Sequence, residues 1–195
     1  MRVRALLFAA AAALCANPAH ASDTGASAQV ESGSVSGVAG VNVAAGNFNQ
    51  QANVGGIALG DIAVAVPSVR QSTSPTPDSA GSLNAGIGPN SFAGSSGWIA
   101  VNGVAGSGNQ QANIAAIAFG MKGVALADAA LSQTRAPNGP AGGSEKPGAV
   151  AERSTAIGEG AFANSSGLVQ VSLIGGDRNS SANTFALSTV DGAQP

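Results

Sequence analysis

The sequence predicts an all-β fold in which three repeats stack as layers of a β-solenoid or of β-arches, with flexible linkers between them. Three observations support this prediction. One segment recurs three times along the 195-residue chain, its copies contain no proline, and Asp, Glu, Lys and Arg make up only 9% of all residues. Recurrence of this kind is typical of stacked or arrayed architectures. The composition favours order built from small residues and neutral amides.

The first element is a targeting segment. Two arginines precede an apolar run from Ala5 to Ala16, and a small-residue pattern ends at Ala21. These features predict a secretory signal peptide over residues 1–21, cleaved after Ala21 once the export machinery has engaged it. The run is too short to cross a bilayer, which needs about 20 apolar residues. We therefore expect a secreted protein without a transmembrane segment.

The mature composition excludes most catalytic and binding classes. Cys15 and His20, the only residues of their types, leave with the signal peptide. Without them the chain lacks the residues for a Ser-His-Asp or Cys-His nucleophile and for a His/Cys zinc site. Asp61, Glu159 and Asp177 are isolated acids, which suit turns or the surface better than a catalytic pair. The sequence thus predicts no enzyme, cofactor or metal site, and its net charge of −2 excludes a basic nucleic-acid footprint.

The repeats can be aligned without gaps. Residues 36–60 read SGVAGVNVAAGNFNQQANVGGIALG, residues 96–120 read SGWIAVNGVAGSGNQQANIAAIAFG, and more than half of these positions match. A weaker third copy, SGLVQVSLIGGDRNSSANTFALSTV, covers residues 166–190 and keeps the Ser-Gly start and the Ala-Asn pair. Each copy is too thin to bury its apolar face alone, so we expect the copies to pack on one another.

Composition also divides the chain into segments. Proline and charge gather between the repeats, which predicts solvated linkers there. The expected segments are the signal peptide (1–21), an N-terminal segment (22–35), repeat 1 (36–66), a linker (67–86), repeat 2 (87–127), a second linker (128–156), repeat 3 (157–190) and a C-terminal tail (191–195).

Strands follow from the alternation of side chains. In the segment from Trp98 to Asn102, Ile99 and Val101 fall on one face and Asn102 on the other. We interpret Trp98 as a packing residue rather than a carbohydrate-stacking one. A second strand is expected at the amide block and a third beyond it, although the spacing of the isoleucines in the second copy also suits a helix. The expected dry interior consists of Val41, Ile57, Val101, Ile117, Val171 and Leu187.

The amide block NQQAN predicts hydrogen-bonded ladders. If repeats stack in register about 4.8 Å apart, equivalent Asn and Gln side chains lie over one another and bond along the stack. Charged residues would repel at that spacing, which explains their scarcity in the repeats. An alternative is that these amides cap turns of an ordinary β-sandwich. The expected self-assembly ladder consists of Asn42, Asn49, Gln50, Gln51, Asn53, Asn102, Asn109, Gln110, Gln111, Asn113, Asn179 and Asn183.

These residues resemble a known family. The segments GVNVAAGNFNQQAN (40–53) and VNGVAGSGNQQAN (101–113) are similar to the repeats of the Fap functional-amyloid fibre subunits. The resemblance implies a secreted bacterial protein whose repeats fold as β-solenoid layers and assemble, with itself or with related subunits, into extracellular fibres of the biofilm matrix. The third copy departs from the pattern, because Ser180 and Ser181 replace the two glutamines. Both a major and a minor subunit fit this resemblance.

A second resemblance supplies an alternative. The segment STAIGEGAFANSSG (154–167) resembles the head repeats of trimeric autotransporter adhesins, which form a β-roll. It implies a cell-surface adhesin that does not polymerise. Both resemblances imply an exported, surface-associated β-solenoid, and the sequence favours the fibre.

Overall fold

The computed structural model describes residues 26–46, 49–73, 82–106, 108–133, 152–176 and 179–190. Within them the fold is all-β, with thirteen strands and no helix, so the predicted fold class is confirmed at this level. None of the described segments contains a helix of the length and apolarity that a membrane crossing requires. The expected signal peptide with its cleavage site at Ala21, the C-terminal tail and Asp177 lie outside the described residues.

The strands form three layers, one for each repeat. The first layer contains β1 (Ala26–Val30), β2 (Ser36–Ala45), β3 (Gln50–Leu59), β4 (Ile62–Ala65) and β5 (Ser68–Thr73). The middle layer contains β6 (Leu83–Ile87), β7 (Ser96–Ala105), β8 (Gln110–Gly120), β9 (Lys122–Ala125) and β10 (Asp128–Gln133). The third layer contains β11 (Arg153–Ile157), β12 (Ser166–Gly175) and β13 (Ser180–Val190).

All described sheets are parallel and pair equivalent strands of successive layers. The sheet orders are β1-β6-β11, β2-β7-β12, β3-β8-β13, β4-β9 and β5-β10, so the middle layer always lies between or beside the others. The register matches the repeat alignment: Ser36 pairs with Ser96, and Ser96 with Ser166. Parallel in-register pairing places identical positions one strand spacing apart, about 4.8 Å.

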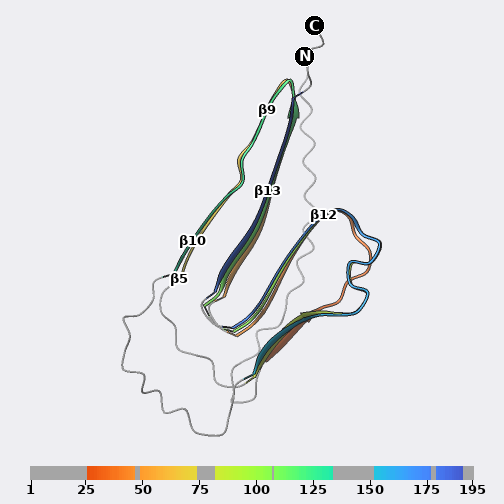
Figure 1. Ribbon diagram of the computed structural model, residues 1–195, viewed down its shortest axis with the longest axis vertical. Coiled ribbons are helices and arrows are strands. Elements are labelled where there is room, and N and C mark those ends of the chain that lie inside the picture. The colour runs from red at the N-terminus through yellow and green to blue at the C-terminus, as the bar shows by residue number, and fades with distance from the viewer. Residues whose placement is uncertain are drawn as a thin grey trace.

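The layers follow a winding path when the stack is viewed end on. Figure 1 shows the β3-β8-β13 sheet in the centre, with the β2-β7-β12 sheet on one side and an arm formed by β4, β5, β9 and β10 on the other. The β1-β6-β11 sheet packs on the far side of the β2-β7-β12 sheet. Gly46 and Gly106, both at positive φ (103° and 130°), follow β2 and β7 where the path turns back.

Three apolar cores lie between these sheets. The largest joins Val43, Ile99, Val101 and Phe92 between the β1-β6-β11 and β2-β7-β12 sheets. The core at the far end of the arm is made only of alanines, including Ala63 and Ala116. The third joins the central sheet to β5 and β10, through Val69, Ala112 and Ile114.

Part of the expected dry interior is wrong. Val41, Val101 and Val171 belong to or pack against the first core. Ile57 and Leu187, however, are 61% and 40% exposed. They lie on β3 and β13 beyond the point where β2 and β12 begin, so no neighbouring sheet covers that end of their face.

The strands reach beyond the boundaries expected for the repeats. β5 and β10 occupy one end of each expected linker, β6 and β11 begin in the other end, and β1 lies in the expected N-terminal segment. The amide block and the apolar run after it form one continuous strand, β3 or β8, so the helical alternative is wrong. These elements escaped prediction because short alternating runs adjoin the proline-rich stretches.

Candidate self-assembly interface

The amides meet where the central sheet faces the β2-β7-β12 sheet. In a strand, alternate side chains point to opposite faces. Asn42, Asn102 and Ser172 therefore point away from the apolar core and toward the amides of β3, β8 and β13, where Asn53 Nδ2 donates to Asn42 Oδ1 at 3.0 Å. This interior is polar, unlike the apolar one expected from the sequence.

One column of asparagines runs through all three layers. Asn113 Nδ2 donates to Asn53 Oδ1 at 3.0 Å, and Asn183 Nδ2 donates to Asn113 Oδ1 at 2.9 Å. Each Nδ2 also donates to a backbone oxygen of the facing strand in its own layer, such as that of Val101 at 3.1 Å. Asn102 adds a cross-link, because its Nδ2 reaches Asn42 Oδ1 at 3.1 Å and Asn53 Oδ1 at 3.0 Å. The column thus ties layers and sheets together.

A second column stands at the bend between the two sheets. Asn49 Oδ1 accepts hydrogen bonds from the backbone N and the Nδ2 of Asn109, at 3.0 and 3.1 Å. Asn109 Oδ1 accepts the same pair from Asn179, at 2.8 and 3.2 Å. Asn49 Nδ2 also donates to Gly106 O at 2.6 Å, which holds the glycine bend. An asparagine here satisfies backbone groups that the bend takes out of the ladder.

The glutamines divide between the two faces of the central sheet. Gln51 and Gln111 face the β2-β7-β12 sheet, and Gln51 Nε2 donates to Gln111 Oε1 at 2.8 Å. Gln111 Nε2 reaches Gly103 O at 3.1 Å and both the O and Oγ of Ser172 at 3.0 Å. Gln50 and Gln110 point to the other face, where their side chains are joined by a longer 3.4 Å bond. The twelve predicted residues therefore do not form a single ladder.

Burial differs sharply between layers. Asn102, Asn109, Gln110, Gln111 and Asn113 of the middle layer have 0% of their surface exposed. Their asparagine and glutamine counterparts in the outer layers, such as Asn42 and Asn179, remain partly or fully exposed, whereas Ser172, the counterpart of Asn102, is 5% exposed. The middle layer shows what an amide position looks like when layers cover it on both sides, and burial at that level requires hydrogen-bonded partners.

The asparagine bonds share one direction. In every side chain to side chain bond between equivalent asparagines, the Nδ2 of the later layer donates to the Oδ1 of the earlier one. The described stack therefore has two chemically different ends, one at the first layer and one at the third.

Three further residues complete the amide interior. The indole Nε1 of Trp98 donates to Gln170 Oε1 at 2.8 Å. Gln170 Nε2 in turn reaches Ile114 O at 3.2 Å and Asn183 O at 3.3 Å. Ser172 lies in register with Asn102. Sequence reasoning did not single out Gln170 or Ser172, although a polar residue alternating with Val169 and Val171 was an available signal.

Aromatic stacking adds to the pairing outside the amide interior. Phe92 and Phe162 occupy equivalent turns, with ring centroids 5.3 Å apart and planes within 7°. Both have positive φ, 59° and 60°, which is uncommon for a bulky residue and persists only where packing enforces it. This turn belongs to the segment that resembles adhesin heads.

The chemistry of this interface suits pairing between like layers. Among the described residues, no three of the types His, Cys, Asp and Glu come together as metal ligands. No solved structure matches this chain. Its sequence matches the functional amyloid protein FapB/FapC family over residues 9–190, nearly its whole length, so the resemblance is confirmed and this protein belongs to that family of functional amyloid proteins.

Proposed function

We propose that the secreted chain assembles by stacking its layers, so that the third layer of one copy pairs with the first layer of the next, into extracellular fibres that support a biofilm. Membership of a structural amyloid family supports a fibre subunit and no enzymatic role. The observation that carries the proposal is the difference in burial: amides buried completely in the middle layer are left partly open in both outer layers.

The outer layers present the groups needed for pairing. β2 and β3 are edge strands on the first layer, and β12 and β13 are edge strands on the third. Edge strands carry a row of backbone donors and acceptors that template another strand. A second copy placed in the same register would extend the asparagine column, with its Asn53 Nδ2 donating to Asn183 Oδ1.

Side-chain size also suits this junction. Within the chain, the Leu173 side chain occupies the space that a Cβ at Gly103 would need in the neighbouring layer. Continued in register, the third layer would place Gln170 against Gly40 of the next copy. A large residue again meets a glycine, which leaves room for its side chain. The junction between copies thus repeats the rule seen between layers.

The cellular route follows from the expected signal peptide. Export would precede stacking, so the partners are the export machinery, further copies of the chain and related fibre subunits. The alternative of a non-polymerising adhesin is not favoured, because the family match points to an amyloid subunit.

Fibre diffraction of the mature protein tests the proposal. Assembly predicts reflections near 4.7 Å and about 10 Å. A soluble monomer or trimer lacking both would refute it. The paired substitutions Gln51→Lys and Gln111→Lys place like charges one layer apart and should block growth. The control puts lysines at Asn84 and Ser96, two exposed middle-layer positions outside the amide interior, and should grow as the parent does.

A further inference from the structure

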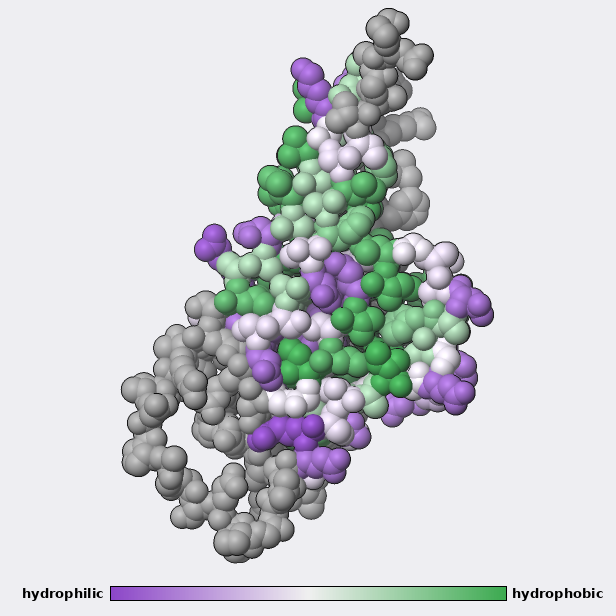
Figure 2. Space-filling view, viewed as in Figure 1, coloured by the Kyte–Doolittle hydropathy of each residue, from purple (hydrophilic) through white to green (hydrophobic). Residues whose placement is uncertain are grey.

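In the outer part of the arm, small side chains are buried and large apolar side chains are exposed. Where β4 and β9 form the arm, its inward side chains are small and its core contains only alanines such as Ala63 and Ala65, whereas β5 turns the larger Val69 inward. Its outward side chains are large, apolar and exposed: Ile62 74%, Val64 58%, Val66 54%, Val124 46% and Leu126 57%. Figure 2 shows apolar surface along the arm. We call the exposed side chains of β4, β5, β9 and β10, with the residues between them, the outer arm face.

This face is continuous. Exposed and covered residues alternate without a slip from Ile62 through Val66 to Arg70 in the first layer, and from Lys122 to Ala130 in the middle layer. Val64 pairs with Val124 in register. The face therefore covers the first two layers along the stacking axis, with Val64 over Val124 and Ile62 over Lys122.

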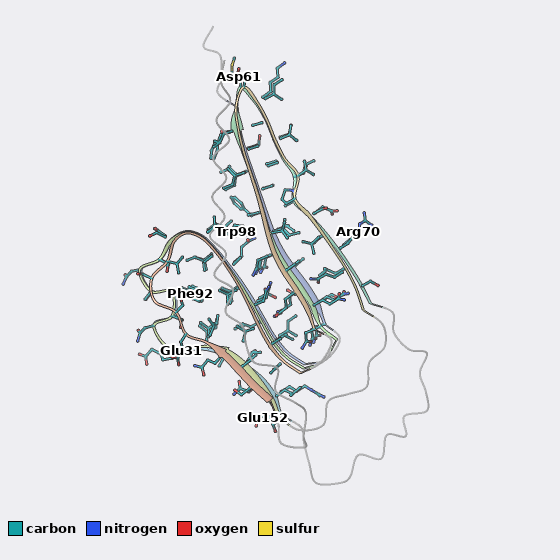
Figure 3. All side chains as sticks on the ribbon, turned by 180° about the vertical axis from the view of Figure 1, so that it is seen from behind. Glu31, Asp61, Arg70, Phe92, Trp98 and Glu152 are labelled. Carbon is teal, nitrogen blue, oxygen red and sulfur yellow. The ribbon has the colours of Figure 1, made fainter. Side chains whose placement is uncertain are left out.

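Opposite charges flank the apolar stretch in both layers. In the middle layer, exposed Lys122 precedes Val124 and Leu126, and exposed Asp128 follows them. In the first layer, exposed Asp61 precedes the stretch and exposed Arg70 follows it. Figure 3 shows Asp61 at the tip of the arm and Arg70 farther down its outer side. Along the sequence, the midpoint between Lys122 and Asp128 is Ala125. The midpoint between Asp61 and Arg70 falls within half a residue of Ala65, which pairs with Ala125.

We infer that the outer arm face pairs with the same face of a second copy, across a two-fold axis parallel to the stacking axis and beside Ala65 and Ala125. The two arms then run in opposite directions. Lys122 meets Asp128 of the second copy within the middle layer, and Asp61 meets Arg70 within the first. Val64 lies opposite Val66, and Val124 opposite Leu126.

Two features of the outer arm face favour a second copy over another partner. The face is self-complementary, as an isologous two-fold interface requires. Its apolar stripe spans two layers one strand spacing apart, and another stack of this chain presents the same two arm layers at the same levels. The inference rests on the proposed function, because stacking repeats this two-layer stripe once per copy along a fibre, and it adds that each fibre contains two stacks side by side.

The charges determine how the two arms align, and the apolar residues supply the binding energy between them. Exposed ion pairs contribute little net affinity, whereas like charges brought face to face disfavour a wrong arrangement. Parallel arms would bring Lys122 to Lys122 and Asp128 to Asp128. With equal layers opposite each other, the antiparallel arrangement is the one in which both layers pair unlike charges.

Mass per length, measured on unstained fibres by electron microscopy, tests the pairing. A subunit of three layers advances about 14 Å along the axis. The parent fibres should contain two subunits in every such advance of about 14 Å along the fibre axis. Lys122→Asp and Asp128→Lys alone should each lower this to one, and the double exchange K122D/D128K should restore two. Glu159→Lys, an exposed reversal outside the arm, should leave two.

The outcomes separate the two proposals. Parent fibres with cross-β reflections but one subunit per advance would overturn the lateral pairing alone. Two subunits that persist in both single variants would overturn the assigned face. If a single variant fails to form fibres, the double exchange decides: two subunits support the pairing and one refutes it. Parent protein that gives no cross-β reflections refutes the stacking itself, and the pairing with it.

Discussion

The indole ring of Trp98 lies where a side chain at position 55 would stand. A Cβ built on Gly55 would meet the Cζ3, Cη2 and Cε3 atoms of this ring. The two residues come from different layers and facing sheets, β7 and β3. The ring is rigid and its Nε1 is bonded to Gln170, so it has little freedom to retreat. Gly55 is therefore required by its neighbour across the interface.

Gly55→Ala should destabilise the stack because the new methyl group overlaps a fixed ring. Overpacking of this kind costs about 1–3 kcal/mol. The guanidinium concentration that dissolves half of the fibres should fall accordingly. Trp98→Leu, which introduces the residue found at the equivalent position 168, should remove most of the penalty of Gly55→Ala in a double-mutant cycle. Additive effects would show that the ring does not hold this position.

Gly97→Ala should be among the most damaging single substitutions. Gly97 has φ of 113°, and a Cβ there would run into the backbone oxygen of Gly37 in the first layer. Left-handed strain and overlap with backbone together cost about 2–5 kcal/mol. Gly33→Ala is the matched control, because nothing lies within 4 Å of its Cβ. Comparable fibre yield and guanidinium resistance of the two variants would contradict the layer spacing at Gly97.

Gln111→Leu should weaken the amide interior more than Gln50→Leu. The first substitution leaves the buried oxygens of Gly103 and Ser172 without this donor. A buried unsatisfied group costs about 1–3 kcal/mol. Gln50 donates to an exposed site at Ser72 O, where water replaces the lost bond, and its bond to the buried Gln110 is long, at 3.4 Å. Guanidinium dissolution of the fibres compares the two, and equal midpoints would argue against a special role for Gln111.

The repeat alignment predicted the register but not the path of the chain. Ser36, Ser96 and Ser166 could be matched from the sequence because identical residues recur at fixed positions. Alternation also placed Ile99 and Val101 together in a core and Asn102 on the opposite face, which is confirmed.

What alternation cannot tell is which face of a strand another sheet covers. Gln51 and Ile57 share one face of β3, yet Gln51 bonds to its neighbours while Ile57 is 61% exposed. The difference arises because β2 accompanies only part of β3. Gln170 was missed for a related reason: its partners Trp98 and Ile114 lie on two other strands, and no local pattern brings them together.

The uniform direction of the asparagine bonds predicts fibres with two unlike ends. Asn53→Lys alters the first-layer face, and Asn183→Lys alters the third-layer face, where stacking would bury the lysine charge among neutral amides. Added as a minor fraction to parent seeds, each variant should bind one end through its intact face and stop growth there. Either variant alone should leave the opposite end growing, and the two together should halt both. Growth at individual ends can be followed by fluorescence microscopy of labelled seeds. One variant that stops both ends, or identical behaviour of the two, would show that copies do not join first layer to third.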